Sequence, residues 1–166
     1  PYWVTNKDVD HWLYRLRDLP DAVQQVRSVI RESRIDLVFS NCGLTPVGAF
    51  AAAAEGVPHV WYLQECFCNE ATGLRFPPGQ EILARVVSEL STTVLAVSEA
   101  VRRELTPWVH EDSIRIVPSG IHVDAYANNR EWTTCRNILS VGTTSRNKGL
   151  DDLVEAARRL DQLGVE

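Results

Sequence analysis

Hydrophobic and polar positions follow two alternating patterns along this chain from residue 20 onward. Short β-branched or apolar runs are followed by longer stretches in which apolar residues recur every three or four positions. The short runs predict strands at residues 37–39, 59–63, 94–97, 114–117 and 138–141. The longer stretches predict helices at residues 21–33, 46–55, 80–90, 98–105 and 149–163. This alternation is typical of an α/β protein with a Rossmann-like parallel sheet flanked by helices.

Several residues indicate where the helices begin and end. Pro20 and Asp21 form a typical start, Gly56 is a typical C-terminal stop, and Ser98 followed by the acidic Glu99 is a typical cap. In the last helix, one face is apolar and is expected to point inward; it consists of Leu150, Leu153, Val154, Ala157 and Leu160. Residues 1–19 show no clear pattern, and their aromatic residues, Trp3, Trp12 and Tyr14, are expected to be packed.

The polar stretch at residues 127–136 predicts a linker between two domains. We expect residues 1–126 to form part of an N-terminal domain and residues 137–166 to begin a second one. The chain contains no methionine, even at position 1, and it stops after a helix where a strand is expected next. Both ends are therefore expected to be cuts in a longer protein.

Composition removes several classes of function. A net charge of −5 and an isoelectric point near 5.4 argue against a nucleic-acid binder, which needs a concentrated basic face. No apolar run approaches the roughly 20 residues of a membrane span, and the N-terminus lacks the features of a secretory signal. The four cysteines, Cys42, Cys66, Cys68 and Cys135, are too sparse for a disulfide scaffold. These features favour a reduced, cytoplasmic setting.

Ligands of open α/β sheets bind beyond the carboxyl ends of the strands, so the residues that follow each predicted strand are site candidates. They are the segments 40–43, 64–65, 98–99, 118–120 and 142–149, which include Asn41, Gln64, Glu65, Ser98 and Gly120. That last segment has glycines at both ends, hydroxyl groups, Arg146 and Lys148 just before a predicted helix, which together suit an anion or phosphate. An ordinary solvated turn explains it equally well. Neither a P-loop nor a G-x-G-x-x-G motif is present.

Two other groups of residues resemble functional sites only weakly, and ordinary structural roles are favoured for both. Cys66 and Cys68 with nearby His59 could suggest a metal, but zinc ligands are usually separated by two to four residues, so loop or core cysteines are favoured. Ser98, Ser119, His122 and Asp124 supply the residue types of a hydrolase triad. No G-x-S-x-G elbow occurs, however, and caps and turns account for them better.

Three segments in order along the chain carry a family resemblance. They are VSEAVRREL at residues 97–105, IVPSGI at 116–121, and LSVG at 139–142 followed by KGLDDLVEA at 148–156. Residues 35–41 and 56–60 match more loosely. Together these segments resemble the retaining nucleotide-sugar glycosyltransferases of family four, which have the GT-B architecture of two facing Rossmann-like domains. The resemblance extends from about residue 21 to the end.

The resemblance implies transfer of a sugar, with retained anomeric configuration, from a nucleotide-diphosphate-sugar donor to an acceptor hydroxyl. No permanently bound cofactor or metal is implied. The implied donor-diphosphate residues are Lys148, Arg146, Gly142 and Thr143, and the implied acceptor-side residues are Gln64, Glu65, Asn41, Ser98 and Gly120. The family's acidic pair lies downstream of Glu166 and its first glycine-rich loop upstream of Pro1, so catalytic residues are not assigned and the chain alone is expected to be inactive.

The resemblance leaves the acceptor open, as a glycan, a lipid or a small molecule, and it leaves peripheral membrane association open. The sequence also departs from the family at four positions. The family usually has arginine at Thr143, histidine at Gln64, asparagine at Ser119 and aspartate at His122. A non-catalytic, flavodoxin-like module that binds a nucleotide or a protein would use the same strand ends and is the alternative.

Overall fold

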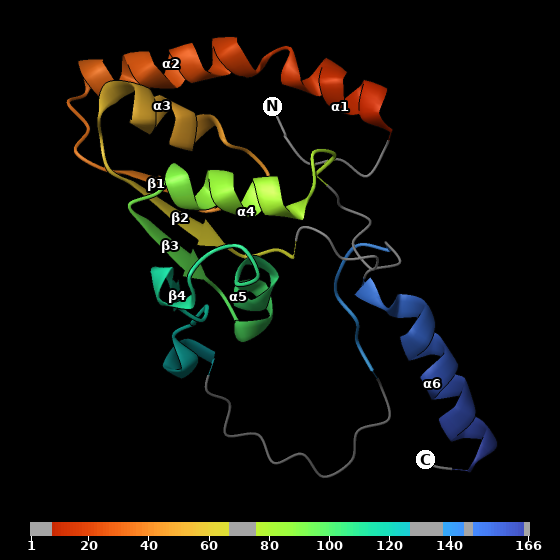
Figure 1. Ribbon diagram of the computed structural model, residues 1–166. Coiled ribbons are helices and arrows are strands. Elements are labelled where there is room, and N and C mark those ends of the chain that lie inside the picture. Colours follow the sequence, from red (N-terminus) through yellow and green to blue (C-terminus); the bar gives the residue numbers. More distant parts are fainter. Residues whose placement is uncertain (1–7, 67–75, 127–137, 145–147, 165–166) are drawn as a thin grey trace. The chain divides into compact units, whose positions relative to one another are not determined.

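The computed structural model describes residues 8–66, 76–126, 138–144 and 148–164 (Figure 1). The chain divides into two compact units, Pro1–Ser119 and Gly120–Glu166. The predicted linker at residues 127–136 lies outside the described residues. The domain boundaries derived from it therefore stay a prediction.

The first unit is built on a four-stranded parallel sheet in the order β1-β2-β3-β4, which confirms the predicted fold class. The strands are β1 (Val38–Ser40), β2 (His59–Leu63), β3 (Thr93–Ala96) and β4 (Ile114–Ile116). Three of the predicted strand ranges shift by one residue at one end or both, and the range of β2 is confirmed without change. Residue pairs in register include Ser40 with Trp61 and Leu63 with Ala96.

Five α-helices belong to the described part of this unit. They are α1 (Val9–Leu16), α2 (Leu19–Glu32), α3 (Val47–Glu55), α4 (Gln80–Glu89) and α5 (Glu99–Leu105). Because crossovers between neighbouring parallel strands are right-handed, α3, α4 and α5 all cover the same face of the sheet. Helix α2 packs on the outside of α3 (Figure 1). A short 3₁₀ helix, η1 (Glu111–Ser113), leads into β4.

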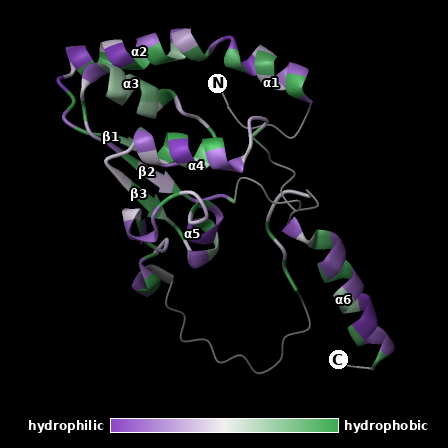
Figure 2. Ribbon diagram, in the orientation of Figure 1, coloured by the Kyte–Doolittle hydropathy of each residue, from purple (hydrophilic) through white to green (hydrophobic). Residues whose placement is uncertain are grey.

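The core lies between the sheet and these helices. Along β2, His59, Trp61 and Leu63 are buried, whereas the alternate positions are only partly covered. They pack with a cluster that includes Val94, Ala96, Leu83, Val87 and Ala49. Figure 2 shows purple and green segments alternating along α2, as expected of a helix with one polar and one apolar face. Among the aromatic predictions, Trp12 is confirmed because its ring packs edge-on against Phe76, but Tyr14 is 58% exposed, so that prediction is wrong.

The second unit contains the 3₁₀ helix η2 (Val123–Tyr126) and α6 (Leu150–Gln162). Helix α6 is confirmed, but residues 138–141 do not form the predicted strand. A strand requires hydrogen bonds to a neighbouring strand, and the described part of this unit offers none. The prediction that the apolar face of α6 points inward is also wrong here, because none of its residues is buried and Val154 is 62% exposed. Within the described residues, no helix has the length and apolar character to cross a bilayer.

One histidine is held in the core by two serines. His59 is 2% exposed, with Nδ1 3.1 Å from Ser91 Oγ and Nε2 2.9 Å from Ser40 Oγ. Burial lowers the pKa of His59 to about 4. Because the folded state resists protonation that the unfolded state accepts, folding stability falls as pH drops below the unfolded value near 6.5.

We predict that His59→Gln flattens the acid dependence of stability. In the unsubstituted chain, the free energy of unfolding should fall by up to about 3 kcal/mol on this account between pH 6.5 and pH 4. Urea unfolding at several pH values across this window measures the slope. The control, exposed His110→Gln, should keep the slope of the parent chain, and an equal slope in the His59 variant would refute the prediction.

A close helix–strand contact gives a second prediction. A Cβ added at Gly48 on α3 would lie 2.8 Å from Ser40 Oγ and 3.3 Å from Val38 Cγ1. Gly48→Val should therefore displace Ser40 from His59 and lower the free energy of unfolding by about 1–3 kcal/mol. The control is Gly120→Val, since a Cβ there meets nothing within 4 Å. Equal denaturation midpoints for the two variants would contradict the prediction.

Candidate functional site

The carboxyl ends of β1 and β2 bring two predicted site residues together. Gln64 Nε2 donates to Asn41 Oδ1 at 2.6 Å, and both side chains are exposed. Asn41 directly follows β1 and Gln64 directly follows β2. Because the strands are parallel and adjacent, their ends meet at one edge of the sheet, and the side chains that follow them reach each other.

Hydrogen bonds from Trp61 and to Glu65 hold the loop after β1 against β2 and the residues that follow it. The buried indole of Trp61 donates from Nε1 to the Cys42 carbonyl at 2.9 Å. The Gly43 N–H donates to Glu65 Oε2 at 3.4 Å, and Cys42 Sγ lies 3.5 Å from Glu65 Oε1. Burial raises the pKa of the Cys42 thiol, and the Glu65 carboxylate acts in the same direction. Glu65 thus holds the loop beside Asn41.

Beyond β3, Ser98 serves as the N-cap of α5. Its Oγ accepts from the Val101 N–H at 3.4 Å, as its position before the helix predicts. Glu99 in the first turn bonds Arg102 at 2.9 Å, and this contact, with that to Arg103, lowers the Glu99 pKa. In the loop after β2, burial raises the pKa of the Cys66 thiol, with a smaller contribution from Glu104 of α5.

The end of β4 is anchored by a residue that the sequence patterns did not single out. Tyr62 of β2 donates its hydroxyl to the Val117 carbonyl at 2.8 Å and lies 3.2 Å from Ser119 Oγ. Only the alternation along β2 hinted at it, because Tyr62 occupies the face opposite Trp61. Ser119 therefore has a structural partner. The hydrolase-triad candidates His122 and Asp124 are exposed residues of the second unit, which begins at the exposed Gly120.

The predicted donor-side residues belong to the second unit. Gly142, Thr143 and Lys148 are exposed, and Arg146 lies outside the described residues. Lys148 stands immediately before Gly149, the N-cap of α6, which has φ +66° and no side-chain cap. The positive end of the helix dipole thus adjoins the lysine. Asp151 and Asp152 in the first turn offset part of that positive end.

The next question is whether the described residues form a cluster of metal-ligating side chains. No group of three or more His, Cys, Asp or Glu side chains among them could hold a metal ion. Both ring nitrogens of His59, the histidine considered with Cys66 and Cys68, face serine hydroxyls. Cys68 itself lies outside the described residues.

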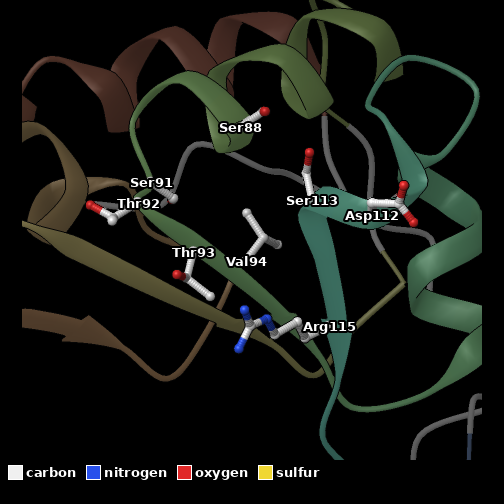
Figure 3. Close-up of a pocket in the computed structure, with 8 residues that line it drawn as sticks. All are labelled: Ser88, Ser91, Thr92, Thr93, Val94, Asp112, Ser113 and Arg115. Carbon is white, nitrogen blue, oxygen red and sulfur yellow. The ribbon is translucent and has the colours of Figure 1, made fainter.

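A polar pocket of about 350 Å³ lies at the opposite edge of the sheet, where β3 and β4 begin. Figure 3 shows its lining, with the Arg115 side chain extended toward the Thr93 side and Asp112 with Ser113 on the other. The remaining lining residues are Ser88, Ser91, Thr92 and Val94. None of the predicted site residues contributes to it. Its position at the amino ends of the strands is the wrong edge for a ligand site of an open α/β sheet.

Comparisons with known proteins bear on the edge that carries Asn41, Gln64 and Glu65. A family model described as Glycosyltransferase Family 4 matches residues 5–125. No curated protein and no solved structure matches the chain. The family match covers well over half of the chain and spans the complete four-stranded sheet together with the ends of all its strands. The chain therefore belongs to glycosyltransferase family 4.

Proposed function

We propose that the chain is the acceptor-side domain, with the first part of the donor-binding domain, of a retaining glycosyltransferase. The enzyme would transfer a sugar from a nucleotide-diphosphate-sugar donor to an acceptor hydroxyl. The observation that carries the proposal is the match of residues 5–125 to a glycosyltransferase family over a sheet whose carboxyl edge gathers Asn41, Gln64 and Glu65. Family membership supports sugar transfer in general.

The acceptor side suits an uncharged hydroxyl group. Asn41 and Gln64 offer amide donors and acceptors at the edge, and the hydroxyl group of Ser98 stands at the end of β3. Gln64 cannot take up a proton in the physiological range, so its role is to position the acceptor through its amide. The Glu65 carboxylate accepts the Gly43 N–H and keeps the neighbouring loop in place.

The donor side would use the start of α6. Departure of a nucleoside diphosphate concentrates negative charge on phosphate oxygens, and cations with backbone N–H groups at a helix N-terminus stabilise such charge. Lys148 and the backbone at Gly149 have that chemistry, and Arg146 would add a guanidinium. Because Asp151 and Asp152 weaken the positive end of α6, the lysine carries a larger share of the attraction.

The proposed reaction balances without a cofactor. The bond between the anomeric carbon and the diphosphate oxygen breaks, and the diphosphate leaves with the electron pair. A bond forms between the anomeric carbon and the acceptor oxygen on the same face of the sugar, and the acceptor hydroxyl releases its proton. The products are the glycoside, the nucleoside diphosphate and one proton.

The exposed apolar face of α6 supports the proposal of a longer enzyme. Val154 is 62% and Leu160 44% exposed, although both lie on the face that the pattern predicts to point inward. An amphipathic helix normally buries that face against further elements. Residues beyond this chain that complete a second sheet would cover it.

Product analysis tests the proposed function directly. The enzyme with both domains is incubated with nucleotide-diphosphate sugars and a panel of acceptors, and the release of nucleoside diphosphate and the anomeric configuration of the product are followed by NMR. Acceptor-dependent release with retained configuration is the expected result. Nucleotide binding without transfer would instead favour the non-catalytic binding module.

We predict that Lys148→Ala lowers kcat/KM for the donor by about tenfold to a hundredfold. A charge-assisted contact to a phosphate contributes about 1.5–3 kcal/mol, whereas an exposed lysine without such a contact contributes much less. The matched control is Arg159→Ala, which removes an exposed cation near the other end of α6. Steady-state kinetics with varied donor measure both variants, and a loss of less than about twofold for Lys148→Ala would remove it from the donor site.

A further inference from the structure

The Asn41–Gln64 pair is held in place by the core of the protein. Trp61, which is 0% exposed, donates to the carbonyl of Cys42, the residue next to Asn41. Gly43, one residue further along, donates to Glu65, the residue next to Gln64. Both bonds therefore hold the loop that follows Asn41 against β2 and the residue after Gln64. An amide pair on such a support loses little conformational entropy when a ligand binds.

The pair keeps hydrogen-bonding capacity after its internal bond is made. The bond uses Gln64 Nε2 as donor and Asn41 Oδ1 as acceptor. Asn41 Nδ2 then retains its two donors, while Gln64 retains one donor and its Oε1 acceptor. Within the part of the chain that the structure describes, neither side chain has another hydrogen-bond partner. A vicinal diol, whose hydroxyl groups each donate and accept, matches this combination.

The charges around the pair disfavour an anionic ligand. The neighbouring Glu65 carries a carboxylate, and its described hydrogen bonds come from the neutral Gly43 N–H and the Cys42 thiol. The arginines of α5 lie in its last turn, away from this edge, where Arg102 pairs with Glu111 just before β4 begins. Among the described residues of this edge, no unpaired cation is available for a carboxylate or phosphate. A like-charged ligand beside Glu65 would be repelled.

We infer that the Asn41–Gln64 amide pair recognises a vicinal diol of a neutral, polyhydroxylated acceptor and discriminates against anionic ones. The inference rests on the proposed function and adds the chemical class of the acceptor. Glu65 contributes in two ways, because it holds the Gly43 backbone and supplies the charge that excludes anions. Because Glu65 repels anions and the two amides are neutral, the preference among acceptors should depend on their charge rather than on their ring size.

Matched neutral and anionic glycosides provide the binding test. The ¹⁵N-labelled chain is titrated with methyl glucoside and methyl glucuronide, with methyl galactoside and methyl galacturonide, and with glycerol and glycerol 3-phosphate. The side-chain amide signals of Asn41 and Gln64 should shift with the neutral members and much less with the anionic ones. Equal or larger shifts with the anionic members, or no shifts of these amides with any neutral member, would overturn the inference.

Substitution tests the charge rule itself. Gln64→Lys places a cation beside Glu65 and should move the preference toward the anionic member of each pair by about tenfold or more in affinity, a change typical of an introduced ionic contact. The matched control is Gln25→Lys, which adds the same cation at an exposed glutamine of α2 and should leave the preference unchanged. An unchanged preference in Gln64→Lys, in a variant that keeps the amide spectrum of the folded chain, would also overturn the inference.

Activity separates this inference from the proposed function. If the enzyme with both domains transfers sugar more efficiently to the anionic member of each pair, the proposed function stands and the neutral-acceptor inference falls. If the Asn41 and Gln64 signals shift with neutral glycosides but no donor supports transfer, the binding preference stands and the proposed function falls. The two failures thus give different results.

Discussion

The hydrogen bond from the buried Trp61 indole to the Cys42 carbonyl links the interior of this domain to its candidate site. Trp61 lies on β2, one of the two inner strands, faces the helices and is 0% exposed, so its N–H needs a partner inside the protein. Its partner is the Cys42 carbonyl in the loop that follows β1, and this hydrogen bond fixes the backbone next to Asn41. The site geometry is therefore a consequence of core packing as much as of the loop sequence.

The other contacts of the edge follow from the same parallel register. Ser40, the last residue of β1, is paired with Trp61, two residues before the end of β2, and the side chains of Asn41 and Gln64 span this offset to meet. Tyr62 points to the opposite face of the sheet from Trp61 and secures the segment after β4 through Val117 and Ser119. The two faces of β2 thus have different roles: the Trp61 face packs in the core, and the Tyr62 face anchors the loop after β4.

Much of this architecture could be predicted from local patterns, and the failures have a common cause. Helices α2 to α6 and the four sheet strands follow from periodicity, whereas α1 was not predicted, and Ser98 and Gly56 mark helix ends through their own chemistry. Strand-end placement also predicted that Asn41, Gln64 and Glu65 lie at the same end of the sheet, where the structure has them. The Trp61–Cys42 and Tyr62–Val117 bonds join residues distant in sequence and carry no local signal. The strand predicted at residues 138–141 is absent because a strand needs a neighbouring strand to pair with, and a local pattern does not show whether one is present.

Hydrogen exchange of the backbone on acceptor binding tests most directly whether the carboxyl edge is the acceptor site. A neutral glycoside acceptor should slow exchange at residues 41–44 and 64–66 and leave exchange at residues 91–94 and 112–115, around the polar pocket, unchanged. Protection of the pocket segments with no change at the carboxyl edge would contradict this expectation.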